Sequence, residues 1–252
     1  MIGASRADVV VLQEATDPGV VEALAASTGM AQFASRKGES LGFLSRERVE
    51  SYMWHKPRVS RHPFLEIQLP ASEARIFGVH LSAVHSAWTE RRRIVELRAL
   101  LRGIAHHQHG LHVLTGDFNT LAPGELLDVR KLPGRLRALV WLSGGTVRWR
   151  TIKVVLDGGY QDAYRTLHPN APGFTFPTWD PHVRLDYLFL PKQHRERLVS
   201  ADVVDVAGVR DASDHLPLLS VVDLPGPSAA GLQPLELGDV GVDVLERDDI
   251  YP

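Results

Sequence analysis

The chain has no cysteine among its 252 residues, which excludes disulfide bonds, thiolate zinc sites and cysteine nucleophiles. Metal sites built from carboxylates, asparagine and histidine remain open. No apolar run approaches the ~18 residues of a transmembrane helix, so no membrane span is predicted. Residues 1–7 lack the basic flank and apolar stretch of a secretion signal, which predicts a cytoplasmic protein. The sequence carries no signal for an oligomeric state.

A strong net charge is also absent, since the formal value is -2. The segment 225–252 nevertheless holds six acids and one arginine, a net charge of -5, which leaves +3 on residues 1–224. We expect residues 1–224 to form one catalytic domain and 225–252 to be an acidic, Pro/Gly-rich linker and tail. The mildly basic residues 1–224 suit a phosphate-bearing substrate that is small or is bound over a short region only. They lack the basic stripe expected of a protein that binds a long duplex.

Hydrophobic residues make up 44% of the chain, which is ordinary for a globular protein. The spacing of apolar residues predicts a long amphipathic helix over 86–107 and a shorter one over 18–27, capped by Asp17. Strands and helices alternate early and strands dominate late, which indicates a mixed α/β domain with packed sheets. Apolar, β-branched runs predict strands at 8–13, 41–45, 75–81, 111–115, 185–190, 201–206 and 216–224.

Polar groups follow three of these strands where each strand ends. Glu14 follows the first, His80 follows the third, and Asp117 with Asn119 follows the fourth. Because loops at strand ends converge over a rigid scaffold, we expect these side chains to meet.

Two further acids stand next to apolar strands. Asp186 lies inside an otherwise apolar run, where a buried carboxylate costs several kcal/mol unless it is paired or hydrogen-bonded. Asp214 and His215 immediately precede the last strand. We therefore expect Asp186 to have a partner.

Taken together, these residues form an ordered set of motifs: Gln13-Glu14, His80-Leu81, Gly116-Asp117-Phe118-Asn119, the Arg-Leu-Asp-Tyr-Leu-Phe run at 184–189, and Ser213-Asp214-His215. This order resembles the endonuclease/exonuclease/phosphatase (DNase I-like) superfamily over residues 7–224. The resemblance implies a four-layered α/β sandwich, with two mixed sheets packed face to face and helices outside. It also implies a metal-dependent phosphoesterase that uses Mg²⁺ or Mn²⁺.

The resemblance assigns the metal to Glu14 first, with Asp214 contributing through the same ion or its water shell. Carboxylate oxygens are what Mg²⁺ prefers, and one or two suffice. His215 would pair with Asp186 and act as a donor to the scissile phosphate or as the base.

Asp117 is the competing candidate for the group that activates water. Asn119 would orient it and bind a phosphoryl oxygen, and His80 would donate to a non-bridging oxygen or to the leaving group.

Three functions fit this pattern. The leading one is hydrolysis of a phosphodiester or phosphomonoester by metal-assisted attack of water on phosphorus, and the second is a nuclease acting on DNA or RNA. The third is a truncated binding module of low activity, because the family's first strand, which carries an asparagine, has no counterpart in the seven residues before Asp8. We expect an unpaired strand flank beside Val9–Leu12, and a gene that continues upstream.

Other segments are assigned lesser roles. The arginines at 91–93 are expected to form a solvated helix face, with at most one directed at the substrate. The four histidines within 106–112 resemble a metal cluster, but those at 106–109 are expected to end the helix rather than bind zinc. Among the aromatic residues of 174–179 we expect at least two to pack in the core. The basic segment 130–150 is the predicted specificity insertion.

Overall fold

The computed structural model describes residues 2–70, 74–83, 87–107, 110–125, 128–131, 134, 137–138, 141 and 150–224. The expected tail 225–252 and most of the segment 130–150 lie outside these residues. In the part of the chain that is described, no helix is long and apolar enough to cross a membrane.

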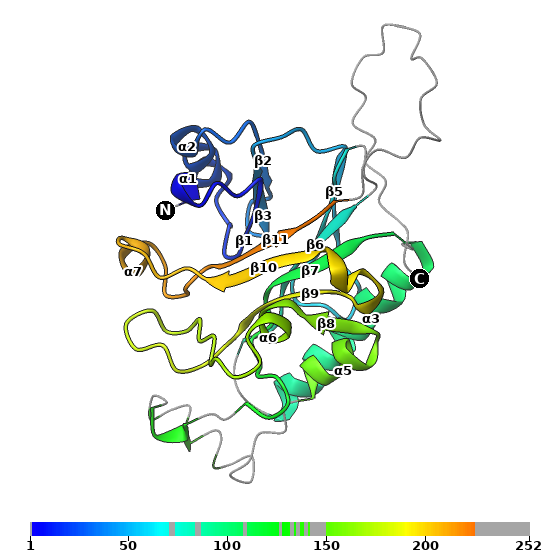
Figure 1. Ribbon diagram of the computed structural model, residues 1–252, viewed down its shortest axis with the longest axis vertical. Coiled ribbons are helices and arrows are strands. Elements are labelled where there is room, and N and C mark those ends of the chain that lie inside the picture. The colour runs from blue at the N-terminus through cyan, green and yellow to red at the C-terminus, as the bar shows by residue number, and fades with distance from the viewer. Residues whose placement is uncertain are drawn as a thin grey trace, which may run out of the picture.

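A six-stranded mixed sheet forms the centre of the domain (Figure 1). Its strand order is β4-β5-β6-β7-β9-β8, in which β6 and β7 run parallel and all other neighbours run antiparallel. The strands are β4 (Ser51–His55), β5 (Phe64–Gln68), β6 (Arg75–His80), β7 (His112–Asp117), β8 (Tyr160–Asp162) and β9 (Asp186–Pro191).

A second β layer packs against this sheet, and it consists of two antiparallel groups of strands. The groups are β1-β3-β2, from Val9–Leu12, Gly42–Ser45 and Gln32–Ser35, and the pair β10-β11, from Leu198–Val203 and Leu218–Val222. Among the described residues β1 pairs with β3 alone, so the expected unpaired flank beside Val9–Leu12 is present. The second layer is therefore divided at β1 instead of forming one continuous sheet.

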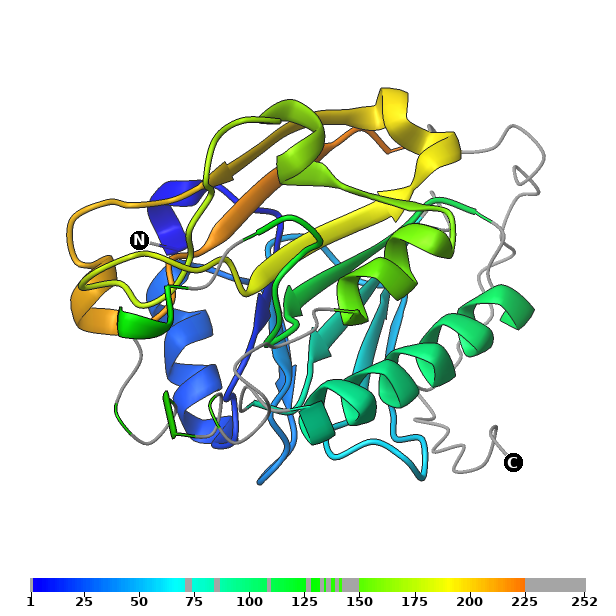
Figure 2. The ribbon, with the colours of Figure 1, turned by 90° about the horizontal axis from the view of Figure 1, so that it is seen from below.

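Helices cover both outer faces and complete the four layers. The helices α3 (Ala87–His107) and α5 (Thr151–Asp157) lie side by side on the large sheet (Figure 2). Leu97 and Leu100 of α3 are buried there against Phe77 and Phe189 of the sheet. The helix α2 (Pro18–Thr28) packs on β1 and β3 from the other side. Shorter helices are α1 (Ile2–Ser5), η1 (Val129–Lys131), α6 (Ala163–Leu167), η2 (Lys192–Arg197) and α7 (Val209–Ala212).

Local chemistry explains where α2 begins and ends. The Asp17 carboxylate accepts a hydrogen bond from the Gly19 amide at 2.9 Å, and Pro18 occupies the first turn, which confirms the predicted cap. The helix ends at Gly29, whose φ of 69° lies in the left-handed region that glycine adopts without a Cβ penalty.

Candidate active site

Three polar side chains lie in one row at the ends of the neighbouring strands β6, β7 and β9 of the large sheet. The register pairs His80 of β6 with Asp117 of β7, and Asp117 with Asp186 of β9. Residues directly opposite one another on neighbouring strands point to the same face. The sheet itself therefore brings these three groups together. This agrees with the expectation that His80 and Asp117 meet, whereas Glu14, which was expected to join them, is not in the row.

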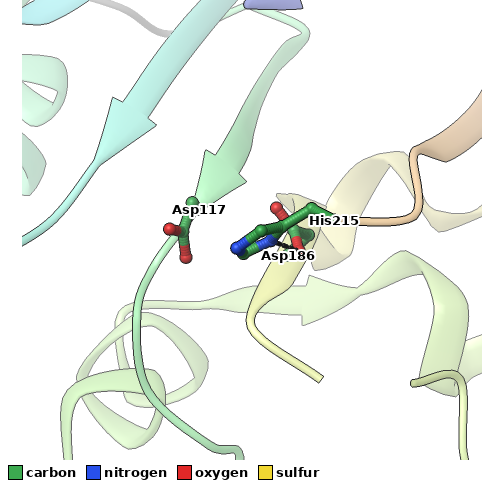
Figure 3. Close-up of side chains that lie close together, drawn as sticks. All are labelled: Asp117, Asp186 and His215. Atoms are coloured by element: carbon green, nitrogen blue, oxygen red, sulfur yellow. Dashed lines mark hydrogen bonds and ion pairs between the residues drawn. The ribbon is translucent and has the colours of Figure 1, made fainter. Parts of the chain in front are cut away.

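His215 reaches this row from the loop before β11. Its Nδ1 lies 2.7 Å from Oδ2 of Asp186, so the buried aspartate has its expected partner (Figure 3). Burial alone would lower the pKa of His215, but the hydrogen bond and charge of Asp186 outweigh it and raise that pKa to about 9. The ring is therefore an imidazolium at neutral pH.

Asp117 and Asn119 form a tight turn directly after β7. The Asn119 amide N–H donates to Oδ1 of Asp117 at 2.8 Å, and its side-chain nitrogen donates to Oδ2 at 2.7 Å and to the Leu81 carbonyl at 2.9 Å. Asn119 has a φ of 53°, a left-handed conformation that asparagine tolerates better than most residues. Burial and the neighbouring Asp186 raise the pKa of Asp117 to about 8. This value lies near the pH at which a general base must work.

His80 lies beside Asp117, with Nε2 at 3.8 Å from Oδ2. Its ring is stacked on that of His62, with 4.9 Å between centroids and 6° between planes. Burial, His62 and His215 together lower the pKa of His80 to about 4, so the ring is neutral at pH 7. His62 was not predicted from the sequence, because a histidine in a loop far from the motifs gives no periodic or spacing signal.

Glu14 and Asp214 lie outside this cluster. Both are exposed, and no hydrogen bond or ion pair involves either carboxylate within the described residues. Glu14 follows β1 and has a φ of 56°. The side chain of its neighbour Gln13 approaches the backbone of Gly116: the Gln13 side-chain nitrogen would lie 3.1 Å from a Cβ placed on that glycine. Asp214 is adjacent to His215 in the chain and its charge favours the imidazolium.

The cluster has the composition of a hard-cation site. Ligand atoms of Asp117, Asp186 and His215 all lie within 4.8 Å of one another. Because burial and the neighbouring Asp186 raise the pKa of Asp117 to about 8, this carboxyl is largely protonated at pH 7 unless a nearby cation favours its ionised form. A divalent cation near the carboxylate oxygens would have that effect, and oxygen donors suit Mg²⁺ or Mn²⁺.

A buried network behind the site contradicts one expectation. Arg93 was expected on a solvated helix face, but its side chain is fully buried and donates to the Ser82 carbonyl at 2.7 Å and to Glu90 at 3.0 Å. Glu90 also accepts from Thr120 at 3.0 Å and from the amide and hydroxyl of Thr151 at 2.7 and 2.9 Å. This network ties the loops after β6 and β7 to α3 and α5.

Aromatic residues flank His215 on one side, and here too an expectation fails. The Phe176 ring is tilted on the His215 ring at 4.8 Å, and Trp179 contacts Phe176 edge-on at 6.3 Å. Trp179 is 69% exposed and Phe174 is 37% exposed, so only one of the three packs inward. In this loop the small residues Thr175 and Thr178 are buried instead, and the Thr178 amide donates to the Asp214 carbonyl.

His112, one of the four clustered histidines, has a structural role. Its two ring nitrogens contact the Gly110 carbonyl at 2.9 Å and the Tyr160 hydroxyl at 2.7 Å, which leaves neither for a metal. The remaining histidine side chains of 106–112 lie outside the described residues.

Several solved structures have a fold similar to that of this chain. The structure is similar to an AP endonuclease from Archaeoglobus fulgidus, with a TM-score of 0.67 and 19% identity over 88% of this chain and 91% of that one. It is similar to the 3' phosphatase NExo from Neisseria bound to a product DNA hairpin, with a TM-score of 0.64 and 18% identity over 86% and 89%. It is also similar to a humanised D. rerio TDP2, with a TM-score of 0.60 and 17% identity over 88% of each chain. No curated protein matches the sequence significantly.

The family model of the endonuclease/exonuclease/phosphatase family matches residues 1–215. The chain belongs to this family, and its mixed α/β fold with helices outside two β layers is the DNase I-like fold of the similar structures.

Proposed function

We propose that this protein hydrolyses a phosphodiester or phosphomonoester with the help of Mg²⁺ or Mn²⁺. The observation that carries the proposal is the contact of Asp186 with His215 at 2.7 Å, in the same row as Asp117 and His80. That arrangement sets an imidazolium beside a carboxylate whose pKa is near neutral, which suits proton transfer at phosphorus.

The protein residues divide the work between donors and a base. His215 as an imidazolium donates a hydrogen bond to a phosphoryl oxygen, and Asp186 holds the ring in place. Ionised Asp117 takes a proton from water while the water oxygen bonds to phosphorus and the P–O bond to the leaving group breaks. The leaving oxygen takes a proton from bulk water and departs as an alcohol. Asn119 orients Asp117, and neutral His80 donates to a non-bridging oxygen or to the leaving group.

The cation would be held by Glu14, with Asp214 contributing through the same ion or its water shell. Both carboxylates are exposed, and the Gln13 side chain, next to Glu14 in the chain, reaches Gly116 beside Asp117. When bound, it would neutralise charge on the phosphoryl group. In the absence of a cation Asp117 remains partly protonated, so metal binding would also favour its ionised form.

Nucleic acid is a second substrate candidate, because the similar structures are an AP endonuclease and a 3' phosphatase bound to a DNA hairpin. Their identity to this chain is below 20%, so the argument for this substrate class is one of analogy. A catalytically silent binding module is less well supported, because the chain retains the full row of polar groups and the His215 pair.

A release assay tests the proposal. Purified protein would be incubated with bis(p-nitrophenyl) phosphate, DNA containing an abasic site, and a lipid phosphodiester, each with Mg²⁺, Mn²⁺ or EDTA. We expect cation-dependent turnover of at least one substrate, lost in EDTA and restored by excess Mg²⁺, with Asp117→Asn as the inactive control. Full turnover in EDTA would reject the metal, and no turnover of any substrate would favour the binding module.

A further inference from the structure

The loop between β4 and β5 is rich in positive charge and contains no acid. Residues 55–63 read His-Lys-Pro-Arg-Val-Ser-Arg-His-Pro. The side chains of Arg58 and Arg61 are exposed, and in the part of the chain that is described neither has an assigned acidic partner. Lys56, by contrast, pairs with Glu39 at 2.9 Å. Two arginines of this loop are thus available to an anion.

His62 places this loop at the candidate active site. Its ring is stacked on His80, which in turn lies 3.8 Å from Asp117. The charge of Arg61 acts on both rings, since it contributes to the lowered pKa of His62 and of His80. Arg61 is therefore adjacent to His62 in the chain, and its charge also acts on His80 of the candidate site.

The loop is also fixed to α3 rather than freely solvated. The Arg61 amide donates to Oε1 of Glu96 at 3.0 Å, and Nε of Arg92 donates to the same oxygen at 3.2 Å. Glu96 is almost fully buried. This shared acceptor joins Arg92 to the backbone of Arg61.

Like charges held together on an anchored surface create a positive potential that attracts an anion. Arginine is suited to phosphate, because its planar guanidinium donates two parallel hydrogen bonds to the phosphoryl oxygens. The anchoring through Glu96 and His62 fixes where such a phosphate would lie relative to His80.

We propose that Arg61, with Arg58 and Arg92, binds a second phosphate of the substrate on the His80 side of the active site. This inference rests on the proposed phosphoesterase function and deepens it: the substrate carries at least two phosphates, one at Asp117 and His215 and one at this loop. A nucleic-acid strand and a small polyphosphorylated molecule share this chemistry.

Equilibrium binding without hydrolysis tests the inference separately from the reaction. Fluorescein-labelled octathymidylate would be titrated in EDTA at several salt concentrations against wild type, Arg61→Gln and Arg58→Gln/Arg61→Gln. Arg48→Gln is the matched control, since Arg48 is an exposed arginine in the turn at the opposite end of β4. Competition by unlabelled octathymidylate and by inositol hexakisphosphate distinguishes the two sources of the second phosphate.

We expect Arg61→Gln to weaken binding roughly threefold to tenfold, and to lower the slope of log affinity against log salt by about 0.7. The double variant should lose more, and Arg48→Gln should match wild type. Equal affinities for Arg61→Gln, Arg48→Gln and wild type would overturn the second phosphate site. Because hydrolysis is measured separately on bis(p-nitrophenyl) phosphate, loss of the proposed reaction and loss of this site give different results.

Discussion

Replacing Glu90 by glutamine should destabilise the fold strongly, because this carboxylate is the counter-charge of a fully buried arginine. Arg93 is 0% exposed and donates to Glu90 through two nitrogens, at 3.0 and 3.3 Å. Removing one partner of a buried ion pair typically costs ~3–5 kcal/mol, since the remaining charge has lost its compensation.

The structure sets the expected loss at the lower end of this range. Glu96 and Asp117 also act on Arg93 and favour its charged form, so some compensation remains after the change. A loss of about 3 kcal/mol corresponds to a fall in Tm of roughly 6–12 °C for a chain of this size.

Thermal unfolding followed by circular dichroism measures this loss. Asp157→Asn is the matched control, because it breaks an exposed pair with Lys153, whose side chain is 61% exposed. An exposed pair of this kind is worth about 0.5 kcal/mol or less, so Tm should fall by no more than ~2 °C. A similar small change for Glu90→Gln would refute the argument that Glu90 neutralises Arg93.

Three further predictions concern the site and its surroundings. Asp186→Asn and His215→Ala should each lower kcat by ~10²–10⁴-fold, and the double variant should be little worse than either, because residues that act as a unit are non-additive; additive losses in steady-state kinetics would show that they act separately. Glu14→Gln should raise the Mg²⁺ concentration for half-maximal activity more than it alters KM, and an unchanged metal titration would remove Glu14 from the ligand set. Burial lowers the pKa of His112, so the unfolded chain binds the proton more readily and stability should fall as pH drops below ~6.5. His112→Gln should reduce the loss of Tm between pH 7 and pH 5, and an identical pH dependence in both proteins would contradict this.

The sequence predicted the parts of the fold that have strong local signals. The long helix, the capped α2 and the strands that carry His80 and Asp117 all occupy residues close to those expected. The expected strand at 201–206 is displaced to Leu198–Val203, because the apolar residues of this stretch continue in both directions and do not define its ends. Propensity alone sets boundaries poorly in such runs.

Four strands were not predicted. The strand β4 lies at the edge of the sheet and is partly exposed, and its hydrophobic residues Tyr52, Met53 and Trp54 are consecutive and do not alternate with polar ones. The strand β8 is only three residues long. In the strand β5, Phe-Leu-Glu-Ile-Gln, apolar and polar residues alternate from Leu65 to Gln68. This pattern after Pro63 could have been used to predict a strand. The fourth, β2, contains a single large apolar residue, Phe33.

The functional contacts outside the motifs were beyond the reach of sequence reasoning. His62 meets His80, and Glu90 meets Thr151, only because the fold brings together residues separated by 18 and 61 positions. No periodicity links such pairs. The strand-end rule correctly grouped His80, Asp117 and Asn119, but it also included Glu14, which lies outside the cluster.

Because His80, Asp117 and Asp186 lie side by side on three neighbouring strands, the proposed catalysis depends on the correct alignment of these strands. A slip of one residue between β6 and β7, or between β7 and β9, would turn these side chains to opposite faces of the sheet. A misaligned molecule could keep its secondary structure and much of its compactness while losing contacts on which the proposed catalysis depends. During refolding, circular dichroism would therefore recover before specific activity, and the interval between the two would report how long the strands take to find their correct partners.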